Sequence, residues 1–236
     1  IPREEMMHYY QMMLGQGIVP RFIEGYDFGI VEPCCYLIAF VDRFKNVFIV
    51  DGFYKPEQDF DLEEQKKRIW EIRNELGCED EYIEADPSVF KRTQVVKNAV
   101  GIKTIAALMK EGTYGVRMRP ADNEVLRGIA KVNMYLAPND LHRHPIRGDR
   151  GAPHLYIATE LTDVINEFTS YYWKVDTDGS RIDSPIDKND HAMNTIKYML
   201  AREPDLATRV KHAPSTAHLT MWREMPDNMK RSRRHG

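Results

Sequence analysis

The sequence predicts an α/β fold in which one mixed sheet carries helices on both of its faces. Three apolar runs follow one another closely between residues 21 and 53, which is typical of an antiparallel meander. Helical patterns then alternate with short apolar runs up to about residue 203, as they do where helices join parallel strands. The two patterns together predict a meander extended by parallel strands.

The composition is that of an ordinary globular protein. Of 236 residues, 42% are hydrophobic and 29% are charged, and the formal net charge of −3 places any nucleic-acid binding in local basic patches. No apolar run approaches the roughly 20 residues that cross a bilayer, so no membrane contact is expected. Three cysteines without a CxxC pair predict a reducing, intracellular setting.

The first half of the chain supplies the expected meander and two helices. The expected helices cover residues 3–14 and 61–76, and Gly77 ends the second of them. The expected strands cover residues 21–28, 35–41, 46–53 and 82–85. Residues 95–110 have a helical pattern that Gly101 interrupts.

The second half alternates strands and helices. Strands are expected over residues 115–118 and 155–158, and residues 142–151 and 175–181 read as a loop and a turn. The expected helices cover residues 123–136 with Asn123 as the cap, 160–173, and a last helix from Asp187 to before Pro204. This order of elements, a meander followed by parallel strands, is that of a ribonuclease H-like fold.

One domain is expected over residues 20–203. Residues 1–19 read as a helix and linker that lead from a missing domain, because the chain begins with Ile. Residues 204–236 read as a polar, basic tail. The Gly-x-x-x-x-Gly-Lys-Ser/Thr loop is absent, so no nucleotide-hydrolysing site of that kind is expected.

Acidic residues stand at two predicted strand ends and on one face of the last predicted helix. Asp27 follows the first strand, and Asp86 follows the strand at residues 82–85. On the helix, an i, i+3, i+4, i+7 spacing places four polar side chains on one face: Asp187, Asp190, His191 and Asn194. Because Mg²⁺ and Mn²⁺ prefer carboxylate ligands, converging acids predict a divalent-metal site for phosphoryl chemistry.

Each of these residues also has a purely structural interpretation. Asp27 and Asp86 stand beside Gly and Pro and could simply form turns. Asp187 could be a helix N-cap. His191 could orient or protonate a leaving group, or it could be a surface histidine bonded to a neighbour.

A basic loop provides candidate contacts to nucleic acid. Arg143, Arg147 and Arg150 lie within the polar segment 142–151. Arginines in such a loop could hold DNA phosphates, and the alternative is a solvated charge cluster.

The motifs in their order resemble the nuclease domain of phage terminase large subunits. The matching segments are Gly25–Gly29, Asp51–Tyr54, Ala85–Pro87, Asn123–Ile129, Glu167–Trp173 and Asp190–Tyr198. Asn194 departs from this resemblance, because relatives carry Asp there as the usual third metal-binding acid. An amide oxygen brings no charge, so three explanations stay open: Asp190 takes over, the substitution is a deliberate inactivation, or this variant binds metal weakly.

The resemblance implies a metal-dependent endonuclease that cuts concatemeric viral DNA during genome packaging, in the host cell cytoplasm. Two Mg²⁺ or Mn²⁺ ions are expected, with Asp27 bridging them, Asp86 on one, and Asn194 or Asp190 on the other. His191 is expected to assist proton movement, while Arg143, Arg147 and Arg150 hold double-stranded DNA by its phosphates.

The implied partners are the ATPase domain of the same polypeptide, which residues 1–19 would join, the portal, and the small terminase subunit. Two alternatives remain at this point: a DNA-binding or docking module weakened at its third ligand, and a resolvase-like nuclease with the same fold and acids.

Overall fold

The structure is a computed structural model that describes residues 1–29, 32–56, 59–78, 82–91, 95–98, 101–175, 181–185 and 190–206. The chain divides into two compact units, Ile1–Asp205 and Leu206–Gly236, and the described helices and strands lie in the first. None of the described helices is both long enough and apolar enough to cross a membrane.

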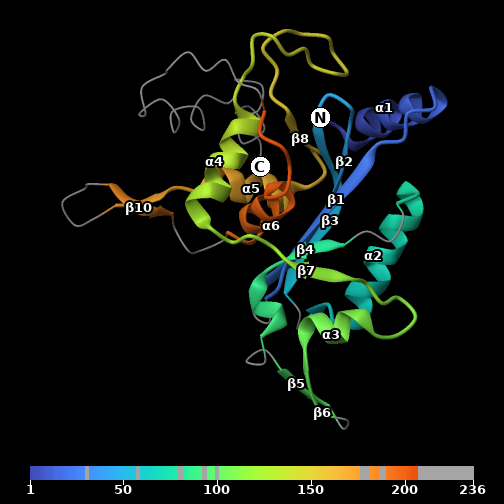
Figure 1. The fold of residues 1–236 in the computed structure, drawn as a ribbon, viewed down its shortest axis with the longest axis vertical. Coiled ribbons are helices and arrows are strands. Elements are labelled where there is room, and N and C mark those ends of the chain that lie inside the picture. Colours follow the sequence, from blue (N-terminus) through green and yellow to red (C-terminus); the bar gives the residue numbers. More distant parts are fainter. Residues whose placement is uncertain are drawn as a thin grey trace, which may run out of the picture. The chain divides into compact units, whose positions relative to one another are not determined.

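A six-stranded mixed sheet forms the centre of the first unit (Figure 1), in the order β7-β4-β1-β2-β3-β8. Its strands are β1 (Arg21–Asp27), β2 (Pro33–Val41), β3 (Val47–Pro56), β4 (Ile83–Ala85), β7 (Met118–Pro120) and β8 (Leu155–Ile157). The first three pair antiparallel, while β4 joins β1, β7 joins β4 and β8 joins β3 in parallel. The predicted meander extended by parallel strands is therefore confirmed.

Helices cover both faces of this sheet (Figure 1). On one face, α1 (Arg3–Gly15) and α2 (Leu62–Leu76) pack against β3. On the other, α6 (His191–Leu200) lies on β1 and β2, and α4 (Val125–Leu136) and α5 (Thr162–Ser170) pack against α6. Because β2 is covered on both faces, it is buried along its length, which explains its continuous apolar sequence.

The core on the α1 and α2 face is rich in aromatic rings. Phe40 stacks on Phe48, which in turn stacks on Tyr156. Met6 and Tyr10 of α1 belong to the same buried cluster, so the first helix packs into the core of the sheet domain. The role of residues 1–19 as a link to another domain stays a prediction.

The predicted end of α2 at Gly77 is confirmed, and the helix also has a cap at its start that was not predicted. Asp61 and Glu64 form a capping box at its start, and Gly77 adopts the left-handed conformation at its end, with φ of 64°.

The helix expected over residues 95–110 is wrong. Residues Val95–Asn98 and Gly101–Thr104 form the hairpin β5–β6, and only Ile105–Lys110 is helical, as α3. Gly101 breaks the helical pattern, and the side chain of Thr104 accepts a bond from the Ala107 amide, which starts the helix there. The pairing of the two strands therefore outweighs the weak helical periodicity of this segment.

Smaller differences concern element ends. Glu124 rather than Asn123 caps α4, because its carboxylate accepts a bond from the Arg127 amide. The expected helix over 160–173 is shorter, and Trp173–Val175 pairs with Arg181–Pro185 as the hairpin β9–β10. The last helix begins at His191, and Asp187 lies outside the described residues.

Candidate functional site

Two neighbouring parallel strands bring Asp27 and Asp86 to the same edge of the sheet. Tyr26 of β1 pairs with Ala85 of β4, and the amide of Asp86 donates to the Tyr26 carbonyl at 3.0 Å. Asp27 is the last residue of β1 and Asp86 directly follows β4. The two aspartates therefore lie at the carboxyl ends of adjacent strands. In open α/β sheets this is the edge at which ligands bind.

Asp86 has a structural role as well. Its Oδ1 accepts a bond from the Ser88 amide at 2.7 Å and starts the short 3₁₀ helix Pro87–Phe90. The turn interpretation offered by the sequence therefore holds for Asp86, and it does not compete with a ligand role, because the carboxylate has a second oxygen.

Close packing of α6 on β1 brings the third group of polar residues to these aspartates. A Cβ at Gly25 would lie 2.6 Å from both Met199 Cγ and the Thr195 carbonyl oxygen. Only glycine permits this approach, which accounts for the Gly25 of the first motif. Five apolar residues of α6 are buried by this packing: Ala192, Met193, Ile196, Met199 and Leu200.

A hydrogen bond joins the start of α6 to the end of β1. His191 Nδ1 lies 2.9 Å from Oδ2 of Asp27, which is only 4% exposed. On the other side of the imidazole, Nε2 lies 3.7 Å from a carboxylate oxygen of Glu32. Glu32 was not predicted from the sequence, where its only signal is an acid in the loop after the Gly25–Gly29 motif.

The electrostatics of this pair reflect its buried position. Burial raises the pKa of Asp27 to about 6, the bond and charge of His191 oppose this, and the nearby carboxylates of Asp86 and Asp190 add to it. Burial acts to lower the pKa of His191, but the bond to Asp27 and the charges of Asp27 and Asp190 raise it overall. The charges of Asp86 and Asp190 therefore act on the buried carboxylate of Asp27, and a cation beside Asp27 would offset this repulsion.

Asp190 and Asn194 occupy one face at the start of α6. Asp190 is the N-cap residue, yet its side chain makes no capping bond. Its Oδ2 instead accepts a bond from Asn194 Nδ2 at 3.1 Å. This contact uses the amide nitrogen of Asn194, so the amide oxygen is not engaged by it.

Glu167 of α5 caps α6 in place of Asp190. It is 3% exposed, its Oε1 accepts a bond from the Met193 amide at 2.7 Å, and its Oε2 accepts one from the Tyr54 hydroxyl at 2.8 Å. No individual role was predicted for Glu167 from the sequence. Its signal was an acid at a buried position of a helix, one turn from Val164 and next to Phe168.

The donor set fits a hard divalent cation. Asp27, Asp86, Asp190 and Asn194 offer oxygen ligands from three separate elements, and the repulsion described above favours a positive charge beside Asp27. Within the described ranges, however, no three His, Cys, Asp or Glu side chains already surround a common point. The residues therefore fit such an ion without forming a closed cage for it.

The basic loop lies at the opposite end of the strands from the acids. It precedes β8, which runs parallel to β3 and hence to β1, so the loop meets the amino end of β1. The seven residues of β1 place roughly 20 Å between the two edges. The structure thus does not bring Arg143, Arg147 and Arg150 to the acids, and Arg147 lies 3.9 Å from Glu5.

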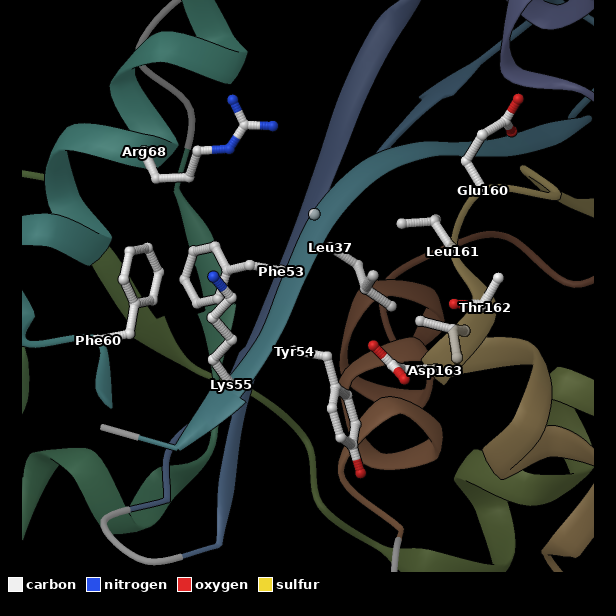
Figure 2. A pocket seen from close by; sticks show the side chains of 12 residues that line it. Leu37, Phe53, Tyr54, Lys55, Phe60, Arg68, Glu160, Leu161, Thr162 and Asp163 are labelled. Atoms are coloured by element: carbon white, nitrogen blue, oxygen red, sulfur yellow. The ribbon is translucent and has the colours of Figure 1, made fainter. Parts of the chain in front are cut away.

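A pocket of about 340 Å³ adjoins the acidic site through Tyr54. Figure 2 shows Phe53, Lys55, Phe60 and Arg68 on one side of it, and the segment Glu160–Asp163 on the other. The Lys55 ammonium lies 5.4 Å from the centre of the Phe60 ring. Charges of both signs line the pocket, so its electrostatics select no anion.

Comparison with known proteins gives the following matches. The family model described as Terminase RNAseH like domain matches residues 43–202. The large terminase nuclease domain of bacteriophage SPP1, with bound Mn, has a TM-score of 0.53 at 16% identity, and the match covers 78% of this chain and 87% of that one. No curated protein sequence matches the chain.

A second solved structure, the large terminase of a thermophilic bacteriophage, has a TM-score of 0.51 at 16% identity. That match covers 78% of this chain but only 40% of the thermophilic phage's chain. At this identity the likeness to both structures is one of fold.

Proposed function

This chain belongs to the terminase RNase H-like domain family, and from that premise we propose that it is a metal-dependent endonuclease that hydrolyses phosphodiester bonds of double-stranded DNA. The single observation that carries the proposal is the meeting of Asp27 and Asp86 at adjacent strand ends, beside the start of α6. In the proposed site, three distant stretches of sequence supply the oxygen donors.

The proposed site uses residues of β1, β4 and α6. Asp27, Asp86, Asp190 and Asn194 would hold two Mg²⁺ or Mn²⁺ ions, and the SPP1 nuclease domain was itself solved with Mn. Such ions would activate an attacking water and offset negative charge on the departing 3′ oxygen.

Two further residues, His191 and Glu167, would stabilise the arrangement of this site. His191 holds a proton at the carboxylate of Asp27, where it stabilises the ionised acid while no other cation is present and can exchange a proton with a reacting group. Glu167 fixes the first turn of α6 and leaves the carboxylate of Asp190 free of capping.

The biological setting follows from the family as part of the same proposal. The domain would cut concatemeric viral DNA during genome packaging, in the host cell cytoplasm, with the ATPase domain, the portal and the small terminase subunit as partners. Arg143, Arg147 and Arg150 would contact the same duplex by its phosphates, roughly 20 Å from the acids.

The direct test is cleavage of supercoiled plasmid DNA in Mn²⁺ by the wild-type chain and by Asp27→Ala. We expect nicking and linearisation by the wild type, none by Asp27→Ala, and wild-type cutting by Asp59→Ala, which removes an exposed acid elsewhere. Equal cutting by the wild type and Asp27→Ala would remove Asp27 from the mechanism.

A second candidate is a DNA-binding or docking module that has lost its activity. The observation in its favour is Asn194, an amide that brings no charge to the α6 face. Retained DNA binding without Mn²⁺ binding at millimolar concentration would support this candidate. Comparing linear, supercoiled and four-way DNA separates the endonuclease from a resolvase-like enzyme, which prefers the branched substrate.

A further inference from the structure

Lys197, in the middle of α6, is a lysine whose side chain is largely buried. It is 6% exposed, and among the described residues its ammonium takes part in no hydrogen bond and no ion pair. Burying a charged side chain costs free energy, and ionisable groups in such positions cluster at functional sites. Burial lowers the pKa of Lys197 accordingly.

The neighbouring helix makes room for this side chain. A Cβ at Gly128 of α4 would lie 3.0 to 3.1 Å from Cβ, Cγ and Cδ of Lys197. Glycine inside a helix is less stable than alanine, so its presence in α4 has a local reason: the Lys197 stem lies against the bare backbone there. The stem is therefore held along α4, and the position is shaped for a long side chain.

The charges that act on Lys197 are those of the acidic site. Asp190, Asp27 and Glu167 are the groups whose negative charge raises its pKa against the effect of burial. Asp190, Asn194 and Lys197 are spaced i, i+4, i+7, so one face of α6 carries all three. Lys197 thus lies on the same face of α6 as the proposed ligands Asp190 and Asn194, about one turn beyond Asn194.

This charge has a different meaning once cations occupy the site. While the site is free of metal, the negative charges of Asp27, Asp190 and Glu167 act on the Lys197 ammonium. Divalent ions on the aspartates would offset most of that negative charge, and a further anion beside the ammonium would then be favourable. The phosphodiester of DNA is the anion that the proposed function brings there.

We propose that Lys197 is a substrate-binding residue whose ammonium donates to a non-bridging phosphate oxygen of the DNA strand at the acidic site. The inference rests on the proposed function, because it takes DNA as the ligand. It assigns Lys197 a role in addition to the oxygen donors, and it accounts for both the buried stem of Lys197 and the glycine at position 128.

The test measures the affinity of the full chain for a short fluorescent DNA duplex in Ca²⁺ over a series of salt concentrations. We expect Lys197→Met to bind about tenfold more weakly, with a slope of log K against log salt smaller by about 0.9, the value for one lost phosphate contact. Lys197→Arg should keep the slope, because it keeps the charge. The control Lys67→Met, on the exposed face of α2, should leave both values unchanged.

Thermal unfolding separates this role from a packing role. Lys197→Met keeps the stem and removes a buried charge, so the variant should be as stable as the wild type or more stable. An unchanged salt slope in Lys197→Met overturns the phosphate contact. If that variant does not fold, Lys197→Gln is measured in the same way, and an unchanged slope there has the same meaning.

Failure of the proposed function gives a different result. A wild-type chain that leaves plasmid uncut in Mn²⁺, while Lys197→Met lowers the salt slope, overturns the proposed cleavage and supports the phosphate contact. Plasmid cutting with an unchanged salt slope supports the cleavage and overturns the role of Lys197.

Discussion

Nδ1 of His191 lies 2.9 Å from Oδ2 of Asp27, and this contact ties the first residue of α6 to the last residue of β1. The two residues are 164 positions apart in the chain. Asp27 is buried, and the charges of Asp86 and Asp190 act on it, so the bond from His191 stabilises its ionised form. In the proposed function His191 would therefore compete with the metal for Asp27.

The first prediction concerns the titration of His191 in the metal-free protein. Its pKa should lie above 6.5, and Asp27→Asn should lower it, because the hydrogen bond to a charged acceptor and its coulombic attraction are lost. The ring-proton NMR shifts of His191, followed against pH, measure both values. An unchanged pKa in Asp27→Asn would show that the contact does not control the imidazole.

The sign of the linked stability effect follows from the same shift. Since the folded-state pKa of His191 is raised, its contribution to stability is complete below 6.5, the unfolded value, and is lost as pH rises through the folded-state pKa.

Mn²⁺ should lower the apparent pKa of His191 by competing for Asp27, and this change reports metal binding without any cleavage. A non-binding cation such as K⁺ at equal ionic strength is the control.

The second prediction concerns the packing of α6 on β1. Gly25→Ala should destabilise the fold by roughly 1–3 kcal/mol, because a Cβ would lie 2.6 Å from a backbone oxygen of the helix and one element must shift. Gly15→Ala is the matched control, since a Cβ there meets nothing within 4 Å. Denaturant unfolding of both variants measures the difference, and equal midpoints would mean that α6 has room to move.

The sequence predicted the fold and the family, and it did so through local patterns that tertiary contacts reinforce. The strand over residues 35–41 could be recognised because both faces of β2 are buried, and the helix end at Gly77 because capping is local. The hairpin β5–β6 was not predicted, because strand pairing depends on contacts between two segments and leaves no periodic pattern within either segment.

The same distinction applies to the site. Asp27 and Asp86 follow strands, so their meeting could be predicted from topology, whereas Glu167 and Glu32 reach the site from other elements and required coordinates. The distance of the basic loop also follows from strand direction, but only once the partner of β8 is known. The metal ligands themselves stay a prediction.

The third prediction concerns Glu167 as the cap of α6. Glu167→Ala should lower stability by roughly 1–3 kcal/mol, because it leaves the Met193 amide and the Tyr54 hydroxyl without their acceptor in a buried place. Tyr54→Phe removes only one of these bonds and should lower stability less. Unfolding curves compare the two, and amide exchange at Met193 should be faster in Glu167→Ala alone. An equal loss in both variants would locate the effect in Tyr54.

The last prediction concerns the missing charge at position 194. Asn194→Asp should strengthen Mn²⁺ binding by roughly tenfold or more, because a carboxylate replaces a neutral amide oxygen on the α6 face. Without metal, Asn194→Asp should lower the stability of the fold. The new carboxylate would lie beside that of Asp190, and the bond that the Asn194 amide nitrogen now donates to Asp190 would be lost. Calorimetric titration with Mn²⁺ measures the affinity, and unfolding in chelator measures the destabilisation.

Asp190→Asn decides which residue serves as the third ligand. If Asn194 holds the ion, this variant should bind Mn²⁺ only slightly more weakly than the wild type, and Asn194→Asp should raise its affinity as much as it does in the wild type. If Asp190 has taken over, Asp190→Asn should abolish binding, and Asn194→Asp in that background should restore it. Because the two carboxylate positions are one helical turn apart on α6, a single ion can reach either of them, and only the double variant tells a substitute ligand from an additional one.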